Sequence, residues 1–370
     1  MSTVRTNKIE LIPGSSQTAL TVPMYTQVDQ LYSFSGTARF DTIQNNGHYQ
    51  PINYNAAIKR YANLGPGSVF GPNGSTATPH NQNPSSVNAA TWCADKELFN
   101  VIAGCQLWRV PITGTYTLTA RGAGRNSSYA GYGISLTCDY KLYAGEWLRI
   151  VCGAQGETNG SNFGGGNGAS CISVFRNGMH LPVLIAGGGA GTSNNSPQSE
   201  NTDRNATPPM ADNGDDTTYS GSGTNYAARD GMGGRGSYYS FDYASPIVHW
   251  GGGGGGGWGT PGGNGTIGQN SPGEHNSGGA ALSSACPHGG YYPESASKNA
   301  YHGGFGGGGA TGIDGGAAGG GGGWYGGNAT FAYTTTSDDT GALGGGSYCA
   351  ANTFTNNGTH GTYGQVDVSL

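Results

Sequence analysis

Charged side chains are scarce in this sequence. Asp, Glu, Lys and Arg together make up 10% of the residues, whereas about 25% is usual in soluble domains. The formal net charge is −5, and no cluster of basic residues occurs anywhere along the chain. Proteins that bind nucleic acid need such a cluster to neutralise phosphates, so we expect no nucleic-acid partner.

Long apolar runs are also missing. No run reaches the roughly 18 apolar residues that a membrane-spanning helix needs, so we expect no membrane insertion. The first residues, Met1 to Pro13, lack the apolar centre of a secretory signal. A protein of this kind that works outside a cell would arrive there by another route, for example as part of a virion.

The cysteines do not form a zinc-binding pattern. There are seven, an odd number, at wide spacings and without a CxxC pair, which argues against a zinc framework. Buried free thiols and disulfide bonds both remain open. The cysteines are Cys93, Cys105, Cys138, Cys152, Cys171, Cys286 and Cys349.

No catalytic motif is present. Cys286-Pro-His288 and His302 lie near one another in the sequence, but neither has the context of a Cys–His nucleophile pair. The glycine runs lack the lysine of a phosphate-binding loop. Asp212 to Asp216 would suit calcium or a solvated acidic loop, and we favour the loop. We therefore expect no enzymatic activity, no cofactor and no metal site.

Seven segments have the pattern of short strands, with alternating or continuous apolar residues between glycine turns and no helical period. They predict an all-β fold, an antiparallel β-sandwich, whose sheet is closed by the last residues of the chain. The predicted strands are 106–111, 115–120, 133–140, 146–152, 171–175, 182–186 and 365–370.

These patterns divide the chain into three parts. Residues 1–30 are polar and read as an attachment arm. Residues 31–186 and 362–370 form the sandwich, which begins with strand-like residues 31–34. Residues 187–361 form a long glycine-rich insertion.

Glycine is abundant, with 73 of 370 residues against a usual share of about 7%. Collagen would need a strict Gly-X-Y period with much proline, and a flexible linker would avoid the bulky Trp258, Phe305 and Trp324 that interrupt the runs. We favour packed segments of polyproline-II type over a disordered tract, because glycine lets such segments approach closely and pair their backbones. Glycines expected to tolerate no Cβ are Gly254, Gly307 and Gly321.

Several segments resemble the glycine-rich region of the anaplastic lymphoma kinase and leukocyte tyrosine kinase receptors, in the same order. They are Gln106 to Gly124, Leu142 to Glu157, Gly164 to Phe175, Leu181 to Gly191, Gly303 to Gly309 and Gly319 to Asn328. The resemblance implies a jelly-roll sandwich of tumour-necrosis-factor type, with an inserted bundle of hexagonally packed polyglycine II helices that binds ligands. We recognise no signal peptide, transmembrane helix or kinase of the receptors in this sequence, so we do not expect receptor signalling.

A second, shorter resemblance concerns the start of the chain. Met1 to Glu10 and Gly14 to Pro23 are similar to N-terminal arms of phage tail-fibre and other virion proteins, and polyglycine sandwiches occur in tail-fibre tip adhesins. This implies a location on the virion and attachment to fibre or capsid proteins through residues 1–30.

Aromatic residues at the ends of the glycine runs are the candidate binding residues. They either cap the packed segments or face outward and stack on a ligand, because Tyr and Trp offer large contact area at low entropic cost. The candidates are Trp258, Tyr291, Tyr292, Tyr301, Trp324 and Tyr325.

The function that these features favour is that of a tail-fibre or virion-surface adhesin which binds a host-cell glycan or protein through its glycine-rich part. Two alternatives stay open, an architectural capsid or fibre cement protein and a soluble receptor-like ligand-binding domain. Association into a homo-oligomer also stays open.

Overall fold

The computed structural model describes part of the chain, and the first four strands by their backbone alone. The predicted arm 1–30 and the strand-like residues 31–34 lie outside the described residues. The described residues are 42–45, 48–51, 59–62, 99–102, 105–110, 113–125, 129–158, 164–192, 205–209, 231–234, 236, 252–265, 277–291, 301–311, 318–329 and 342–369.

The chain divides into two units, Met1–Tyr54 and Asn55–Leu370. In the first unit, β1 (Thr42–Asn45) and β2 (His48–Pro51) pair as an antiparallel hairpin. The sheets and the glycine segments belong to the second unit.

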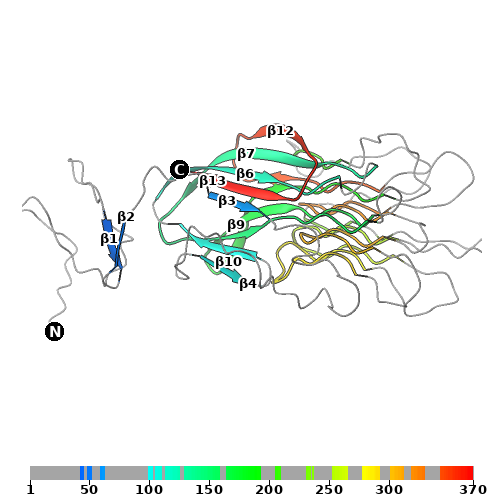
Figure 1. Cartoon of the computed structure of the whole chain (residues 1–370), viewed down its shortest axis with the longest axis horizontal. Coiled ribbons are helices and arrows are strands. Elements are labelled where there is room, and N and C mark those ends of the chain that lie inside the picture. Colours follow the sequence, from blue (N-terminus) through cyan, green and yellow to red (C-terminus); the bar gives the residue numbers. More distant parts are fainter. Residues whose placement is uncertain are drawn as a thin grey trace, which may run out of the picture. The chain divides into compact units, whose positions relative to one another are not determined.

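The described strands of the second unit form two antiparallel sheets (Figure 1). The six-stranded sheet runs in the order β11 (Tyr348–Cys349), β10 (Met179–Ala186), β9 (Ser170–Arg176), β8 (Trp147–Val151), β5 (Cys105–Arg109) and β4 (Phe99–Ile102). The five-stranded sheet runs in the order β12 (Thr355–His360), β7 (Gly133–Leu142), β6 (Gly114–Arg121), β13 (Gln365–Ser369) and β3 (Lys59–Ala62).

The all-β prediction agrees with this structure, in which the described residues contain strands and no helix. All seven predicted strands are formed, within a few residues of the expected bounds. The C-terminal strand β13 lies inside the five-stranded sheet, between β6 and β3. β11 and β12 fall within the range 187–361 that the sequence assigns to the insertion, so this range contributes a strand to each sheet.

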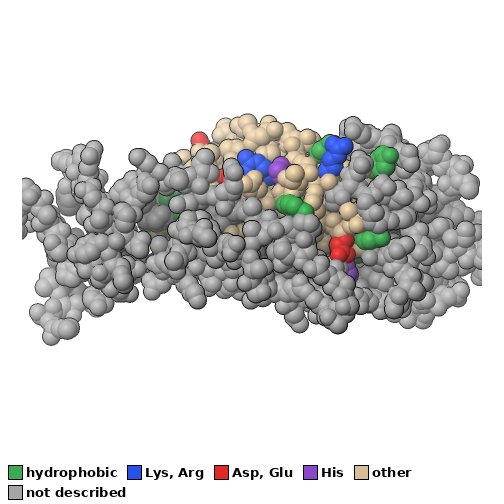
Figure 2. Space-filling model, viewed as in Figure 1, with side chains coloured by type: hydrophobic (Ala, Val, Ile, Leu, Met, Phe, Trp, Pro, Cys, Tyr) green, Lys and Arg blue, Asp and Glu red, His purple; other side chains and the backbone are tan. Residues whose placement is uncertain are grey.

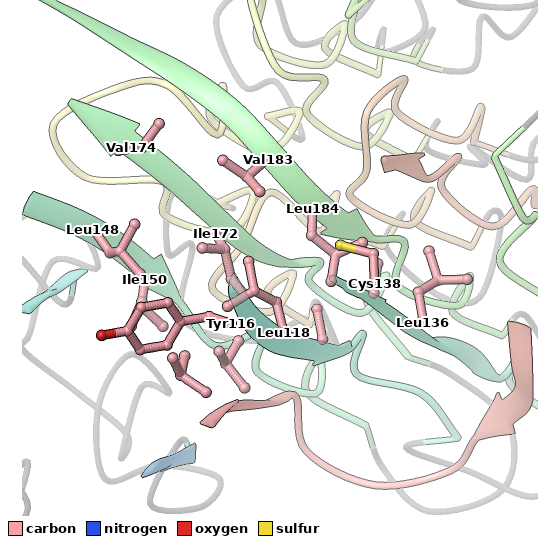
Figure 3. Packing of buried hydrophobic residues seen from close by; sticks show 14 of the residues in the cluster. Tyr116, Leu118, Leu136, Cys138, Leu148, Ile150, Ile172, Val174, Val183 and Leu184 are labelled. Carbon is pink, nitrogen blue, oxygen red and sulfur yellow. The ribbon is translucent and has the colours of Figure 1, made fainter. Parts of the chain in front are cut away.

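The main core lies between the two sheets. Alternate residues of each strand point to the same face, and on β6 these are Tyr116, Leu118 and Ala120, all buried. Figure 3 shows Tyr116 and Leu118 facing Ile150 and Ile172 of the other sheet. Each fully buried side chain of this size stabilises the fold by about 1.5–3 kcal/mol.

A second core lies on the opposite face of the six-stranded sheet. Val151, Cys171 and Ile185 each follow or precede a residue of the main core and therefore point the other way. They pack against Leu282 and Phe305 from the glycine-rich part. The glycine-rich part is thus attached to this sheet by apolar contacts as well as by the chain itself.

The glycine segments run away from one end of the sheets and back (Figure 1). The segment 153–157 continues from β8, 164–169 leads into β9, and 187–192 continues from β10. Further segments alternate in the same way between a sheet-proximal end, near the second core, and a sheet-distal end. These segments are 252–257, 260–265, 277–282, 286–291, 301–305, 307–311, 318–323, 326–329 and 342–346.

The segment 252–257 shows how these segments are joined. Its backbone groups bond to six described segments, and groups three residues apart bond to the same neighbour. The N–H groups of Gly253 and Gly256 donate to carbonyls of the segment 307–310, at 2.8 and 2.6 Å. Those of Gly254 and Gly257 donate to carbonyls of 260–263, at 2.9 and 3.0 Å, and that of Gly255 donates to the Gly327 carbonyl at 2.8 Å. The carbonyls of Gly253 and Gly256 accept from N–H groups of the segment 318–323, both at 3.1 Å. Those of Gly254 and Gly257 accept from N–H groups of 277–282, at 3.0 and 2.9 Å, and that of Gly255 accepts from the Gly234 N–H at 2.7 Å.

This spacing leaves no room for side chains between the segments. A Cβ built on Gly321 would overlap the carbonyl oxygen of Gly188, and one on Gly255 would overlap that of Gly321. Gly307 has a φ of +84° at a turn, and a Cβ there would lie 3.0 Å from the Ala280 oxygen. Glycine is required at these positions by close approach or by backbone conformation.

Candidate functional site

The candidate aromatic residues separate into two groups at opposite ends of the glycine segments. Trp258, Trp324 and Tyr325 follow the runs that end at the sheets, whereas Tyr291 and Tyr301 lie at sheet-distal ends. Tyr292 lies outside the described residues. Sequence reasoning could not separate the two groups, because the direction of each glycine segment depends on the number of turns before it.

The sheet-proximal group makes contacts within the protein. The Trp324 ring stacks on the Tyr348 ring of β11, with centroids 4.4 Å apart and planes at 25°. Trp258 and Trp324 both pack against the second core. The Tyr325 hydroxyl shares a 2.7 Å hydrogen bond with the Thr207 hydroxyl. These contacts are those of capping residues, one of the two roles expected for the aromatics.

The sheet-distal group is held by hydrogen bonds between segment ends. The Tyr291 carbonyl accepts from the N–H and from the hydroxyl of Ser277, at 2.8 and 2.9 Å. The Tyr301 carbonyl accepts from the Thr311 N–H at 2.9 Å. Both tyrosines are half-buried. Their backbones are therefore fixed, and part of each side chain is exposed at this end.

His302 and Glu157 extend this group. The His302 ring stacks on the Tyr291 ring, with centroids 5.3 Å apart and planes at 17°. The backbone N–H of His302 donates to Glu157 Oε2 at 3.2 Å, and the His302 Nε2 atom lies 4.0 Å from the same oxygen. Burial raises the pKa of the Glu157 carboxyl to about 7, and the hydrogen bond from His302 opposes this rise.

We therefore define the distal cluster as Glu157, Tyr291, Tyr301 and His302. Sequence reasoning named the two tyrosines as candidates but had no signal that would bring Glu157 beside them, since it lies 134 positions before Tyr291 in the sequence. A carboxylate, an imidazole and phenol rings at one end can donate and accept hydrogen bonds and stack on a flat apolar face.

Of the two histidines considered as partners of Cys286, His288 donates its backbone N–H to the Cys286 carbonyl at 2.8 Å, whereas His302 lies at the other end of the glycine segments. Cys286 packs against the second core at the sheet-proximal end, while His302 belongs to the distal cluster. Burial raises the pKa of the Cys286 thiol to about 11, so this thiol is not activated. Asp212 to Asp216 lie outside the described residues.

The described surface offers little charge for recognition. On the face shown in Figure 2 it is mostly uncharged, with a few basic and acidic side chains. Among the described residues, no group of three or more His, Cys, Asp or Glu side chains is arranged to hold a metal ion. The described part of the chain also contains no helix long and apolar enough to cross a membrane.

A comparison with protein-family models finds none that matches the chain.

Proposed function

We propose that the glycine segments are polyglycine II helices, inserted into a jelly-roll sandwich of tumour-necrosis-factor type. A helix of this kind has three residues per turn and no internal hydrogen bonds. The three-residue repeat of hydrogen bonds along 252–257, and its six neighbours, support this assignment. The order of the sequence segments supports kinship with the glycine-rich region of the two receptors.

On this framework, the protein is a virion adhesin whose sheet-distal end binds a glycan or protein of the host-cell surface. The observation that carries the proposal is the position of Tyr291 and Tyr301, half-buried at the ends of segments that otherwise have almost no side chains. Aromatic side chains on a rigid support bind with little loss of entropy, and binding residues commonly lie where a scaffold presents its connections.

Attachment to the virion is assigned to residues 1–30, which would dock on fibre or capsid proteins. The resemblance of this arm to other virion proteins supports the assignment. The division of the chain at Tyr54, which leaves the arm outside the unit that holds the sheets, also supports it.

An architectural role is the second candidate. The contacts of Trp258, Trp324 and Tyr325 favour it, because they are those of residues that close a packed lattice. The third candidate, a soluble receptor-like domain, rests on the receptor resemblance.

The test compares the loss of the two distal tyrosines with the loss of one exposed tyrosine elsewhere. The double variant Tyr291→Ala, Tyr301→Ala removes the distal aromatics, and Tyr143→Ala removes an exposed tyrosine (47% exposed) from the turn between β7 and β8, at the opposite end of the sandwich. Labelled proteins are applied to intact cells and to an array of immobilised cell-surface glycans. We expect the double variant to bind more than about tenfold more weakly, since an aromatic hot spot is worth about 2 kcal/mol or more.

Tyr143→Ala should bind like the unmodified protein. Undiminished binding by a correctly folded double variant would remove the distal end from consideration and leave the architectural role as the better account.

A further inference from the structure

Two cysteines from different sheets face each other across the main core. Cys138 lies on β7, is 3% exposed, and belongs to the core between the sheets. Cys349 lies on β11, and its Cα partner on β10 is Leu184. Directly paired residues share a face of a sheet, so Cys349 points to the same side as Leu184, which is also a core residue. Figure 3 shows the Cys138 sulfur beside Leu184.

The two thiol groups are in contact. They share a hydrogen bond, which raises the pKa of Cys138 and lowers the pKa of Cys349. Cys349 is only partly buried and packs against the rim of the core. A reagent in solution therefore reaches Cys349 first, and Cys349 is also the better nucleophile of the two because it forms a thiolate more easily.

We propose that Cys138 and Cys349 form a disulfide bond in an oxidising environment and so join the two sheets covalently. With a low-molecular-weight disulfide as the oxidant, the Cys349 thiolate attacks one sulfur of the oxidant and expels a thiolate. The Cys138 sulfur then attacks the mixed disulfide at Cys349, and its proton passes to the second thiolate that leaves. Two cysteine thiols are oxidised to one disulfide, and the oxidant is reduced to two thiols.

The position of this bond explains what it would do. The loop that it closes contains β8, β9, β10 and the whole described glycine-rich part, from 153 to 346. β11 is a two-residue edge strand, and it is the strand at which the chain returns from the last glycine segment. The bond would hold this short strand, and with it the end of the glycine-rich part, on the sandwich.

Other described cysteines have different partners. The Cys105 thiol lies 3.8 Å from the Ala285 carbonyl oxygen, and Cys152 accepts a hydrogen bond from Gln106. Cys286 is partly buried like Cys349, but burial raises its pKa to about 11. Cys286 therefore serves as a matched control, as a partly buried cysteine that the proposal leaves reduced.

Peptide mapping tests the pairing directly on the full chain. The folded protein is incubated with oxidised glutathione at pH 8, free thiols are blocked with N-ethylmaleimide, and the denatured protein is digested with trypsin. Cleavage after Lys and Arg places Cys138 on peptide 126–141, Cys349 on 299–370 and Cys286 on 236–298, each without another cysteine. We expect 126–141 and 299–370 to appear as one linked species, lighter than their sum by two hydrogen atoms, and 236–298 to carry the blocking group.

The thermal transition gives a second measurement. Oxidation should raise the transition temperature of the unmodified protein and of Cys286→Ser by several degrees, and should leave that of Cys349→Ser unchanged. Blocking groups on both Cys138 and Cys349 after oxidation, or a link from either one to another cysteine, would overturn the proposal. The mapping needs no variant, so a folding defect in Cys349→Ser would not affect its result.

Discussion

At Gly321 the Cα hydrogen that stands where other residues carry Cβ faces the carbonyl oxygen of Gly188. The segments that carry these residues are held at a distance set by backbone hydrogen bonds, such as the one from Gly188 to Gly322 at 2.8 Å. A methyl group between them would push apart segments that each pair with several others. Individual glycines in this part of the chain are therefore packing residues, in the way that large apolar residues are in an ordinary core.

The first prediction compares the effects of two glycine-to-alanine substitutions on the free energy of unfolding. Gly321→Ala should lower the free energy of unfolding by about 3 kcal/mol or more, because the added Cβ meets backbone that cannot rotate away. Gly259→Ala is the control, since its nearest heavy atom would be the Gly231 oxygen at 3.6 Å, and its effect should stay within about 0.5 kcal/mol. Urea unfolding measures both. Equal effects at the two positions would contradict close packing of the glycine segments.

The second prediction concerns pH and Glu157. Burial raises the pKa of this carboxyl from 4.5 to about 7 in the folded protein, so the folded state holds the proton more tightly than the unfolded state. Stability from this group is then greatest at low pH and is lost as the pH rises through about 7. Glu157→Gln keeps a hydrogen-bond acceptor for His302 and removes the charge, so the variant should be the more stable protein at pH 8, by at most about 3 kcal/mol.

Urea unfolding at pH 4 and pH 8 checks this sign. Near pH 4 the carboxyl is protonated in the folded protein, and the variant should match the unmodified chain. A variant that is less stable at pH 8 would mean that the Glu157 charge is stabilised by a partner such as His302, whose Nε2 lies 4.0 Å away.

At the scale of elements, the glycine-rich part is anchored to the six-stranded sheet by Arg149 on β8. Its guanidinium is buried and donates to the carbonyl oxygens of Leu282 and Ser284, at 2.6 and 2.5 Å. These carbonyls belong to a sheet-proximal turn, in which the N–H groups of Leu282 and Ser283 donate to the carbonyls of Gly257 and Trp258. The arginine thus supplies side-chain donors to two carbonyls of this turn, where the glycine segments meet the sheet.

The third prediction is that Arg149→Met loosens this junction before it affects the sandwich. The buried Leu282 carbonyl and the partly buried Ser284 carbonyl would lose their charged donor, which costs about 3 kcal/mol or more. Hydrogen exchange should become faster in 277–291 while β6 and β7 keep their protection. Uniform loss of protection across both sheets would show that Arg149 stabilises the whole unit rather than the junction.

Prediction from sequence succeeded for strands whose apolar residues alternate or run together, and it failed for strands without such a pattern. β6, β8 and β9 have apolar residues that alternate or run together, and their bounds were predicted within a few residues. β12 is Thr-Asn-Asn-Gly-Thr-His, with mostly exposed residues, and had no such signal. It forms because its backbone pairs with β7 at the sheet edge and because Asn357 donates to the Thr137 hydroxyl at 2.8 Å.

The same limit applies to the candidate site. The glycine runs and the aromatics at their ends were visible in the sequence, and the need for glycine at Gly307 and Gly321 agrees with their surroundings. The end at which each aromatic lies depends on which segments pair, and glycine carries no side chain that encodes this choice. For the same reason, the approach of Glu157 to His302 had no local signal.

At the scale of the unit Asn55–Leu370, a sandwich with an ordinary apolar core is joined to a glycine-rich part held by backbone hydrogen bonds. Glycine loses more conformational freedom on folding than any other residue. The many bonds between segments offset that loss, and the result is a support that presents the distal cluster in a fixed arrangement. The binding proposal depends on this arrangement, because it places Tyr291 and Tyr301 at the end farthest from the sheets.

Hydroxyl-radical footprinting of the protein bound to cells that retain it tests this central claim most directly. The proposal predicts that oxidation of Tyr291 and Tyr301 falls severalfold on binding, while Tyr143 and Met179, which are exposed at the opposite end of the sandwich, react as they do in the free protein. Protection of Tyr143 and Met179 with unchanged reaction at Tyr291 and Tyr301 would contradict it.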